Sequence, residues 1–248
     1  MGRLAGKIAL VTGGTRGIGR GIAQAFLAEG ARVAFSGTSR QTVDAAAGAL
    51  ATSAACAGFV AELADPAAPA ALVAAAIARF GGLDIVVNNA GVVTRASEWE
   101  LEPQEWDRVH AVNLRAAFFV AREAAKSMRE RGGGAIVNVS SIAGQSGGIA
   151  GSPAYAAAKA GVIGLTRSLA RRFAPHRIRV NCLAPADIET DMTAGWPAEL
   201  RERLIAITPL ARFGGVDEVT GGAVFLASDE SSFITGQTLA INGGAYMG

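Results

Sequence analysis

The chain has 248 residues, of which 50% are hydrophobic, 6% aromatic and 18% charged, and its formal net charge at pH 7 is +2. This length suffices for one large hydrophobic core, and a small net charge without a basic block gives no indication of nucleic-acid binding. No apolar run reaches the roughly 18 to 20 residues that span a bilayer, and the N-terminal residues lack the long apolar region of a signal peptide. Two cysteines beside apolar residues, Cys56 and Cys182, cannot form a disulfide framework, so we expect a cytoplasmic protein without membrane association.

Short β-rich runs alternate with longer alanine-rich segments along the whole chain. The runs predict strands over 7–12, 32–36, 57–63 (the weakest), 83–89, 134–141, 177–185 and 237–242. Most of them lack polar–apolar alternation, which indicates strands buried on both faces. Helices are predicted over 17–29, 40–50, 66–80, 103–131, 153–174 and 216–227. This order predicts one α/β domain over residues 1–248, a Rossmann-like, doubly wound parallel sheet of about seven strands with helices on both faces.

The segment 186–213 interrupts this alternation. It lies between a predicted strand and a predicted helix and is too long for a simple turn. Insertions at such places are often lids over a binding site, so we expect a substrate lid here. In an open parallel sheet, ligands bind at the carboxyl ends of the strands. The residues that follow each strand are therefore the first candidates for function.

A glycine-rich turn, TGGTRGIGRG, follows the first predicted strand. Gly13, Gly17 and Gly19 lie between that strand and the next helix. Glycine lets the backbone turn sharply and approach a pyrophosphate, and the N-terminus of a helix attracts that anion. The spacing differs from G-x-G-x-x-G, so a glycine turn without a ligand remains the alternative.

The end of the second predicted strand bears on which dinucleotide would bind. NAD-binding folds usually place an acid about 20 residues after the glycines, where it binds the ribose 2′-OH. Here the sequence is AFSGTSRQ, in which Ser36 and Thr38 stand where an acid would, and Arg40 follows. Hydroxyl and guanidinium groups accept a 2′-phosphate, and Arg16 in the glycine turn could bind it bidentately. We predict NADP(H) in preference to NAD(H); the alternative is that Arg16 and Arg40 are solvated surface arginines.

The stretch SPAYAAAKAG contains a candidate acid/base pair. Ser152 suits a helix N-cap and Pro153 the first helical position, which places Tyr155 in the first turn and Lys159 one turn later on the same face. A tyrosine hydroxyl has a pKa of about 10, and a nearby ammonium lowers it, so the pair would form an acid/base near neutral pH. A structural tyrosine beside a solvated lysine is the alternative.

Other polar residues follow strands at the same predicted sheet edge. Ser140 and Ser141 end one strand, and Asn88 and Asn89 end another, within reach of a cofactor. Asn113 lies inside a predicted helix, where asparagine is unfavourable. A buried hydrogen bond or a water relay would compensate for it.

Taken together, these motifs resemble the short-chain dehydrogenase/reductase family over essentially the whole chain. TGxxxGxG (12–19), NNAG (88–91), Asn113, Ser141, Tyr-x-x-x-Lys (155–159) and NGG (242–244) occur in the family's order. The resemblance implies that Tyr155 is the acid/base, that Lys159 lowers its pKa and binds the nicotinamide ribose, that Ser141 binds the substrate oxygen and that Asn113 holds a relay water. It implies no metal. The resemblance also implies a set of cofactor contacts, to which we add the three residues at and after the second predicted strand. The full set is Gly13, Thr15, Arg16, Gly17, Ile18, Gly19, Ser36, Thr38, Arg40, Asn89, Ala90, Gly91, Tyr155, Lys159, Pro185, Ile188 and Thr190.

Two positions depart from the family pattern. The family usually has glycine after Pro185, and this chain has Ala186; it also usually has glycine where this chain has Arg177. If the backbone at position 186 requires a positive φ, alanine is strained there and the nicotinamide site is altered.

Within the family, four segments resemble bacterial 3-oxoacyl-[acyl-carrier-protein] reductases: YAAAKAGVIGLTRSLA, IETDMT, FLASDESSFITGQTL and NGGAYM. This implies NADPH-dependent reduction of a 3-oxoacyl thioester, on acyl carrier protein or CoA, to the 3-hydroxyacyl thioester of fatty acid biosynthesis. An acidic carrier protein would be attracted by a basic rim around the site. The alternative is that the candidate arginines only form a solvated helix face. These candidates are Arg129, Arg131, Arg171, Arg172 and Arg177. The residues expected to border the substrate are Val93, Gln145, Ile149 and Trp196.

Two other functions remain open from the sequence. Related enzymes act on sugars, polyols, steroids and small alcohols, and the same fold also occurs in cofactor-binding regulators without turnover. The family is commonly tetrameric, which implies contacts through the helices 103–131 and 153–174. The small residues that would allow close helix approach there are Ala156, Ala160, Gly161 and Gly164.

Overall fold

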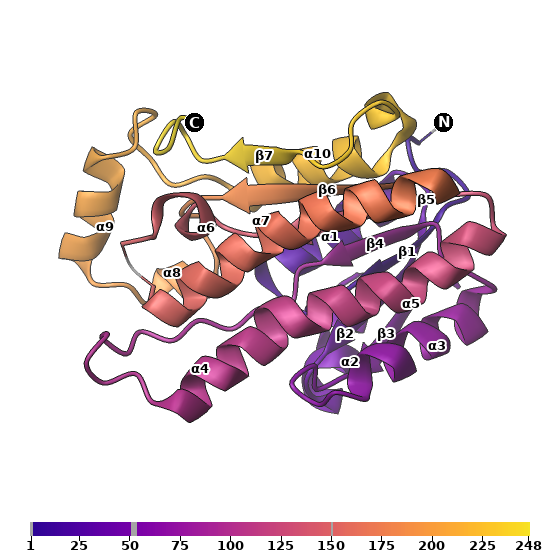
Figure 1. Cartoon of the computed structure of the whole chain (residues 1–248), viewed down its shortest axis with the longest axis horizontal. Helices are drawn as coiled ribbons and strands as arrows, with labels where there is room; N and C mark the ends of the chain where they lie inside the picture. Colours follow the sequence, from indigo (N-terminus) through magenta and orange to yellow (C-terminus); the bar gives the residue numbers. More distant parts are fainter. Residues whose placement is uncertain (1, 51–53, 150) are drawn as a thin grey trace.

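A parallel seven-stranded sheet forms the centre of the computed structural model, which describes residues 2–50, 54–149 and 151–248 (Figure 1). The strand order is β3-β2-β1-β4-β5-β6-β7, and every neighbouring pair is parallel. The chain first builds outward from β1 and then returns to continue on the other side through β4, as in a doubly wound sheet. The predicted fold class is thus confirmed. The strands are β1 Ile8–Val11, β2 Arg32–Gly37, β3 Cys56–Val60, β4 Ile85–Asn88, β5 Gly134–Val139, β6 Ile178–Pro185 and β7 Thr238–Ile241.

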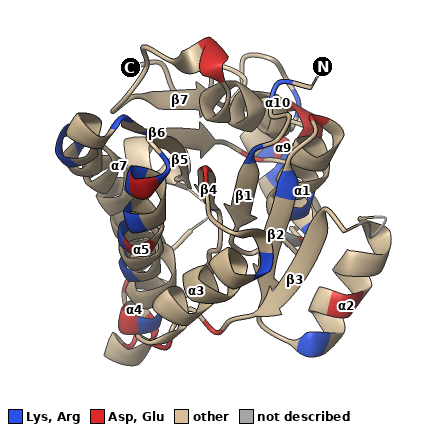
Figure 2. Cartoon of the chain, turned by 90° about the vertical axis from the view of Figure 1, so that its right-hand side faces the viewer, with Lys and Arg blue, Asp and Glu red and all other residues tan. Residues whose placement is uncertain are grey.

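Helices cover both faces of the sheet, as the edge-on view in Figure 2 shows. One face carries α3 (Ala68–Phe80), α5 (Ala116–Glu130) and α7 (Pro153–Phe173). The opposite face carries α1 (Gly17–Ala28), α2 (Arg40–Ala49) and α10 (Val216–Ala227). Each of these helices lies within two residues of its predicted bounds, except that the predicted helix 103–131 is interrupted.

Successive side chains of the central strands enter two different cores. In β1, Ile8 and Leu10 pack with the α3, α5 and α7 layer, whereas Ala9 and Val11 pack with the α1, α2 and α10 layer. All four are at most 1% exposed. Burial of one large aliphatic side chain contributes about 1.5–3 kcal/mol, so the two cores hold the sheet from both sides. This explains why the strand sequences show no polar–apolar alternation.

The predicted helix 103–131 is divided by a π-helical turn. α4 spans Pro103–His110, the π-helical turn η1 spans Ala111–Arg115, and α5 follows. Asn113 lies at the centre of this turn, and its side-chain amide donates to the carbonyl oxygen of Val109, four residues earlier (2.9 Å). A side chain that bonds the helix backbone competes with the regular pattern, and π-turns occur frequently at functional sites.

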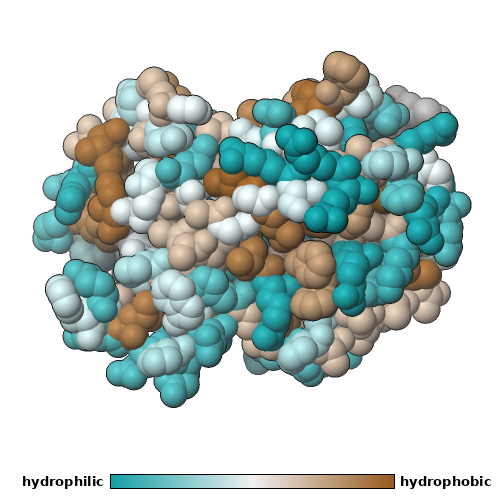
Figure 3. Space-filling view, in the orientation of Figure 1, coloured by the Kyte–Doolittle hydropathy of each residue, from teal (hydrophilic) through white to brown (hydrophobic). Residues whose placement is uncertain are grey.

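The segment between β6 and α10 contains two helices that the sequence analysis did not specify. α8 (Asp191–Ala194) and α9 (Ala198–Ala206) lie beyond the carboxyl ends of the strands, at the left of Figure 1. Apolar surface gathers over α9 in Figure 3. A further short helix, α6 (Ala143–Ser146), follows β5, and 3-10 turns span Ala174–His176 and Asp229–Ser231. Among the helices described, none has the length and apolar character needed to cross a bilayer.

The two departures from the family pattern differ in backbone conformation. Arg177 ends the 3-10 turn before β6 with φ +56°, in the left-handed region. Ala186 is not among the residues with positive φ. The backbone strain that we considered for Ala186 is therefore absent, and the position that favours glycine is that of Arg177.

Replacing Arg177 with glycine should stabilise the protein. A non-glycine residue in the left-handed region costs roughly 1–2 kcal/mol, and the extra entropy of glycine in the unfolded chain offsets about 0.4–1 kcal/mol of the gain. We expect Arg177→Gly to raise the melting temperature by roughly 2–4 °C in thermal unfolding. The matched control, Ala186→Gly, should lower it, because only the entropy term applies there; stabilisation by both variants would contradict this account.

Candidate active site

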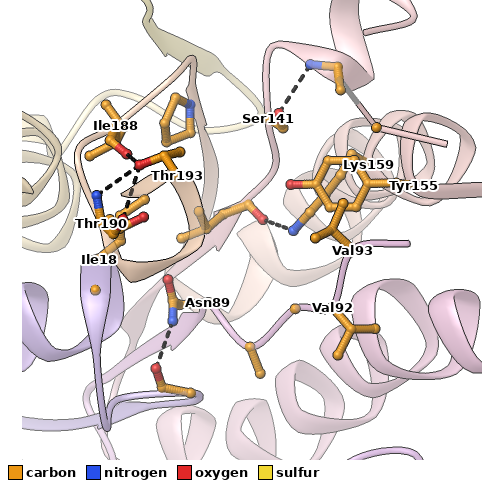
Figure 4. A pocket seen from close by; sticks show the side chains of 18 of the residues that line it. Ile18, Asn89, Val92, Val93, Ser141, Tyr155, Lys159, Ile188, Thr190 and Thr193 are labelled. Carbon is orange, nitrogen blue, oxygen red and sulfur yellow. Dashed lines mark hydrogen bonds between the residues drawn. The ribbon is translucent and has the colours of Figure 1, made fainter. Parts of the chain in front are cut away.

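A cavity of about 790 Å³ opens at the carboxyl edge of the sheet. Its wall is built by the turns that follow β1 to β6, by the start of α7, and by the α8–α9 segment. Figure 4 shows Tyr155, Lys159 and Val93 on one side of it, and Ile188, Thr190 and Thr193 on the other. The cavity lies where a doubly wound sheet is expected to bind its ligand.

The glycine turn after β1 is held in a shape that only glycine allows. Gly13 and Gly17 have φ of +64° and +51°, in the left-handed region. A Cβ on Gly19 would overlap the carbonyl oxygen of Gly13 and the side-chain amide of Asn89. The turn therefore presents bare backbone and the N-terminus of α1 to the cavity, which is a suitable surface for a pyrophosphate.

Hydrogen bonds connect this turn to the end of β4. The hydroxyl of Thr12 accepts hydrogen bonds from the backbone N–H groups of Asn89 and Ala90, each at 3.0 Å. The side-chain amide of Asn89 in turn donates to the carbonyl oxygens of Thr12 (3.0 Å) and Gly13 (3.1 Å). Asn89 lies in the cavity wall, and its amide group fixes the glycine turn.

Asn88, which the sequence analysis also placed near a cofactor, points instead into the core. Its side-chain amide donates to the carbonyl oxygen of Ala117 (3.1 Å) and to Oδ1 of Asn138 (2.9 Å). Asn138 donates onward to the hydroxyl of Thr166 in α7 (2.9 Å). Side chains alternate along a strand, so the neighbouring residues Asn88 and Asn89 face different directions.

The residues proposed for a 2′-phosphate occupy different environments. Thr38 and Arg16 are exposed and lie in the cavity wall, Arg16 at the N-cap of α1. Ser36 also lies in the wall but is 1% exposed, and its hydroxyl accepts a hydrogen bond from the backbone N–H of Gly13 (3.3 Å). Arg40 lies outside the wall, at the start of α2, where its guanidinium is 3.8 Å from the carboxylate of Asp44.

The candidate acid/base pair stands on the first two turns of α7. The Ser152 hydroxyl caps this helix by accepting from the backbone N–H of Tyr155 (3.4 Å), and Pro153 is its first residue. Lys159 is 4% exposed, and its Nζ lies 5.6 Å from the centre of the Tyr155 ring. The ammonium donates to the carbonyl oxygen of Val139 (2.9 Å). Two of its three donors are therefore left without a protein partner among the described residues.

Burial dominates the protonation of both groups. It raises the pKa of Tyr155; a hydrogen bond with Ser141 opposes this rise and the charge of Asp187 adds to it. The net shift of the Tyr155 pKa is upward in the protein alone, because burial outweighs the other contributions, whereas the sequence led us to expect a lowered value; the effect of Lys159 itself stays a prediction. Burial also lowers the pKa of Lys159 to about 8. At neutral pH, Tyr155 therefore carries its proton and is able to donate it.

The two serines after β5 have separate roles. The Ser140 hydroxyl donates to the backbone carbonyl of Lys159 (2.7 Å) and so holds α7 against the strand. The Ser141 hydroxyl accepts a hydrogen bond from the backbone N–H of Ala143 (3.1 Å) and lies beside Tyr155 in the cavity wall. Only the hydroxyl of Ser141 is thus placed to bind a substrate oxygen next to the Tyr155 hydroxyl.

Asn113 lies behind the wall rather than in it. Its amide donates to the carbonyl oxygens of Val92 (2.8 Å) and Val109 (2.9 Å), and its Oδ1 accepts from the backbone N–H of Val92 (3.1 Å). A Cβ on Gly91 would lie 2.6 Å from this oxygen and 3.4 Å from Nζ of Lys159. Gly91 therefore keeps a narrow space between Asn113 and the lysine.

Most of the remaining predicted residues line the cavity, and one does not. Pro185, Ile188 and Thr190 form one part of the wall, and Val93, Ile149 and Trp196 form another. Gln145 is not in the wall, because α6 directs its side chain elsewhere; its Oε1 is buried without a partner among the described residues. The other predicted residues in the wall are Thr15, Ile18, Gly19, Ala90 and Gly91.

The structure adds wall residues that the sequence analysis missed. The main ones are Arg95, Arg108, Asp187 and Thr193. Asp187 could have been found, because it comes two residues after the end of a predicted strand, where ligand-binding residues are expected. Arg95 lies in the irregular segment after β4, and no sequence pattern indicated that its guanidinium would lie 5.7 Å from the Trp196 ring centre.

The five arginines considered as a basic rim do not surround this cavity. They lie at the ends of α5 and α7 and before β5 and β6, at the opposite edge of the sheet; Figure 2 looks onto this side. Arg131 is paired with Asp84 (2.9 Å). Helix direction explains the error, because residues at the C-terminus of a helix that runs antiparallel to the strands lie at the strands' amino ends. No group of three or more metal-binding side chains is found in the described part of the chain.

Comparison with known proteins gives the same fold over nearly the whole chain. The family model described as enoyl-(acyl carrier protein) reductase matches residues 13–246. The 3-oxoacyl-[acyl-carrier-protein] reductase FabG of Escherichia coli K12 is 40% identical over 242 residues, which cover 98% of both chains. FabG of Staphylococcus aureus Mu50 is 40% identical over 97% of this chain and 98% of the relative. A crystal structure from Sinorhizobium meliloti 1021, described as a "putative short-chain alcohol dehydrogenase", is 37% identical, covers 98% of this chain and 97% of its own, and superposes with a TM-score of 0.90.

Replacing Lys159 with methionine should stabilise the protein while it removes activity. The folded pKa of about 8 lies below the unfolded value of 10.5, so below pH 8 the folded state carries the full cost of a buried ammonium, roughly 3 kcal/mol. Between pH 8 and 10.5 the unfolded state binds more protons, and wild-type stability rises with pH. We expect Lys159→Met to raise the free energy of unfolding at pH 7, measured with urea, and this gain to shrink above pH 8. A variant less stable than wild type at pH 7 would contradict this.

Proposed function

This chain belongs to the short-chain dehydrogenase/reductase family, and we propose that it uses NADPH to reduce the keto group of a 3-oxoacyl thioester to a hydroxyl. Membership of the family makes it an NAD(P)-dependent oxidoreductase that acts on CH–OH and C=O groups. The observation that carries the proposal is the convergence of Tyr155, Ser141 and Lys159 on a cavity that also contains the glycine turn. We propose Asn113 as the fourth member of this catalytic group.

Ser141, Tyr155 and Asn113 have different roles in the proposed reduction. When bound beside the glycine turn, a nicotinamide cofactor would supply the hydride for reduction of the carbonyl carbon. Ser141 donates its hydroxyl hydrogen to the carbonyl oxygen and stabilises the negative charge that develops there. Tyr155, protonated at neutral pH, gives its proton to the same oxygen. Asn113 then holds a water between the Val92 segment and Lys159, through which the proton of Tyr155 is replaced.

The chain's own groups fit a dinucleotide. Lys159 has a buried ammonium with one protein hydrogen bond, and ribose hydroxyls would satisfy its other donors. The glycine turn leaves backbone free for the pyrophosphate, and the family resemblance assigns Ile188 and Thr190 to the nicotinamide end. Arg16 and Thr38 in the wall, with no acid among Ser36–Thr38, favour the 2′-phosphate of NADPH.

The choice of substrate rests on the relatives. Several proteins 40% identical over nearly their full length are named 3-oxoacyl-[acyl-carrier-protein] reductases. The matching family model is described by a different acyl-carrier-protein reaction, so the family alone does not select the substrate. The alternative is a short-chain dehydrogenase acting on a sugar, polyol, steroid or small alcohol. A regulator without turnover is the less favoured reading, because Tyr155, Lys159, Ser141 and Asn113 are all present.

A carrier-protein substrate would meet the arginines near the cavity first. Arg16, Arg95 and Arg108 lie in its wall and would attract an acidic partner. The five arginines at the far edge serve this role only if a second subunit brings them to the cavity. We propose a cytoplasmic protein that interacts with an acyl carrier protein.

We also propose a homotetramer built through α5 and α7. The Ala156, Ala160 and Gly164 positions are small and at least partly exposed on α7, and a Cβ on Gly164 would meet nothing within 4 Å. Gly161 is different, because a Cβ there would lie 2.7 Å from Leu114 of the same chain. Gly161 is therefore required within one subunit rather than between subunits.

Tyr155→Phe tests the proposed chemistry. With acetoacetyl thioesters and NADPH, we expect kcat to fall by roughly 10²–10⁴-fold, because the proton donor is lost. NADPH binding, followed by its fluorescence, should change little. Sugars, diketones and steroids tested with wild-type protein distinguish the alternative substrates. Unchanged turnover in Tyr155→Phe would exclude the proposed mechanism.

Arg16→Ala tests the cofactor preference. A charge-assisted hydrogen bond contributes about 1.5–3 kcal/mol, so the ratio of kcat/KM for NADPH to that for NADH should fall at least tenfold. Arg20→Ala, which removes an exposed arginine of α1 outside the wall, is the matched control and should keep the wild-type ratio. If Arg16→Ala also keeps it, Arg16 does not contact the phosphate.

A further inference from the structure

The wall of the active-site cavity contains a carboxylate that the proposed mechanism does not use. Asp187 follows β6 by two residues, is half-buried, and shares the wall with Tyr155, Ser141 and Trp196. Its negative charge raises the pKa of Tyr155, and Coulomb interactions of this kind act over short distances in a protein. Asp187 also lies between Pro185 and Ile188, wall residues that the family resemblance assigns to the nicotinamide end, and this places its carboxylate near the reacting end of the cavity.

This carboxylate stands without a partner among the residues that the structure describes. In the parts of the chain that the structure describes, no residue donates a hydrogen bond to it or pairs with it as an ion. Arg212, which lines a second, small cavity together with Asp187, is already bound to both oxygens of Glu218 (2.7 Å each). Burial without compensation raises the pKa of Asp187. An acid that is desolvated in this way is costly unless a partner is supplied.

The backbone around Asp187 is fixed on both sides. The carbonyl oxygen of Asp187 accepts from the backbone N–H of Gly214 (3.0 Å), and Ile188 forms a parallel bridge with Gly214. On the other side, the backbone N–H of Ala186 donates to the carbonyl oxygen of Ile241 (3.0 Å). None of these hydrogen bonds uses the Asp187 side chain. The carboxylate is therefore held in place by the main chain, and its replacement leaves these contacts intact.

We infer that Asp187 is a specificity-determining residue, which accepts a hydrogen bond from a hydroxyl or amino group that the substrate carries close to its reacting carbonyl. An ionised carboxylate only accepts hydrogen bonds, so it selects a donor. A substrate with a methyl group at the same place would desolvate the carboxylate without replacing its hydrogen bonds to water. Sites built to bind a polar group reject analogues that lack it.

The inference deepens the proposed function by specifying the substrate. It rests on that function in one respect, namely that Tyr155 and Ser141 bind a carbonyl group. Applied to a 3-oxoacyl thioester, it specifies an acyl group with a hydroxyl or amino substituent near the keto carbon, in place of a plain alkyl chain. Applied to the alternative substrates, it specifies a hydroxy ketone or amino ketone. The carbonyl chemistry is the same in both cases.

Hydroxyacetone and butanone provide a matched pair of probes, since they differ by a hydroxyl against a methyl group beside the same ketone. The measured quantity is the ratio of their kcat/KM values with NADPH, compared between wild type, Asp187→Asn and Asp187→Leu. The comparison between variants removes the difference in intrinsic reactivity. We expect the ratio in Asp187→Leu to fall at least tenfold below wild type, mostly through KM, and that in Asp187→Asn to fall less because an amide still accepts. Aminoacetone, used in the same way, distinguishes an amino from a hydroxyl donor.

Glu199→Gln is the control, because it removes an exposed carboxylate of α9 that lies outside the wall and should keep the wild-type ratio. An unchanged ratio in both Asp187 variants would overturn the inference, as would a raised KM for NADPH with the ratio unchanged, which would assign Asp187 to the cofactor. If Asp187→Leu does not fold, Asp187→Asn decides the outcome. Failure of wild type to reduce both acetoacetyl and 4-hydroxy-3-oxobutanoyl thioesters, with an Asp187-dependent ketone ratio, would exclude the thioester function and leave the inference standing.

Discussion

The hydroxyl of Thr12 holds together the two strand ends on which the site depends. Because the sheet is wound in two directions from β1, the turns after β1 and β4 separate here and open a crevice. The Thr12 hydroxyl, with two backbone N–H groups of the β4 turn bound to it, limits how far they separate. Asn89 returns two hydrogen bonds to the glycine turn. The position of the glycine turn relative to Tyr155 and Lys159 follows from this connection.

Desolvation determines the protonation of the ionisable side chains in the cavity. The same loss of water keeps Tyr155 protonated, weakens the protonation of Lys159 and leaves Asp187 in need of a partner. The protein compensates little of this internally: the lysine has one hydrogen bond and Asp187 has none among the described residues. Uncompensated groups at functional sites commonly find their partners in the ligand. The cavity is thus less favourable alone than when occupied, and its stability is coupled to binding.

The sequence was sufficient for the fold and for most of the wall because both follow from local rules. Strand–helix alternation predicted the sheet, and residues after strands reached the cavity, as Ser141 and Asn89 do. The predictions from the sequence were wrong where the outcome depended on the direction of a side chain or of a helix. Asn88 points into the core, Gln145 points away from the cavity, and the arginines at the ends of α5 and α7 lie at the far edge. The sign of the Tyr155 pKa shift was also wrong, because burial is a property of the assembled cavity and not of the Tyr-x-x-x-Lys spacing.

The polar chain from Asn88 through Asn138 to Thr166 has a consequence for folding. These side chains link β4, β5 and α7 inside a core that is otherwise largely apolar. Aliphatic strands slide past one another with little penalty, whereas amides separated from their partners in a low-dielectric core lose several hydrogen bonds at once. A shift of β5 by one residue would turn Asn138 to the other face of the sheet. These hydrogen-bonded side chains therefore specify the register of the strands. They make sheets with a shifted register unfavourable and so favour the alignment in which Ser141 and Tyr155 meet.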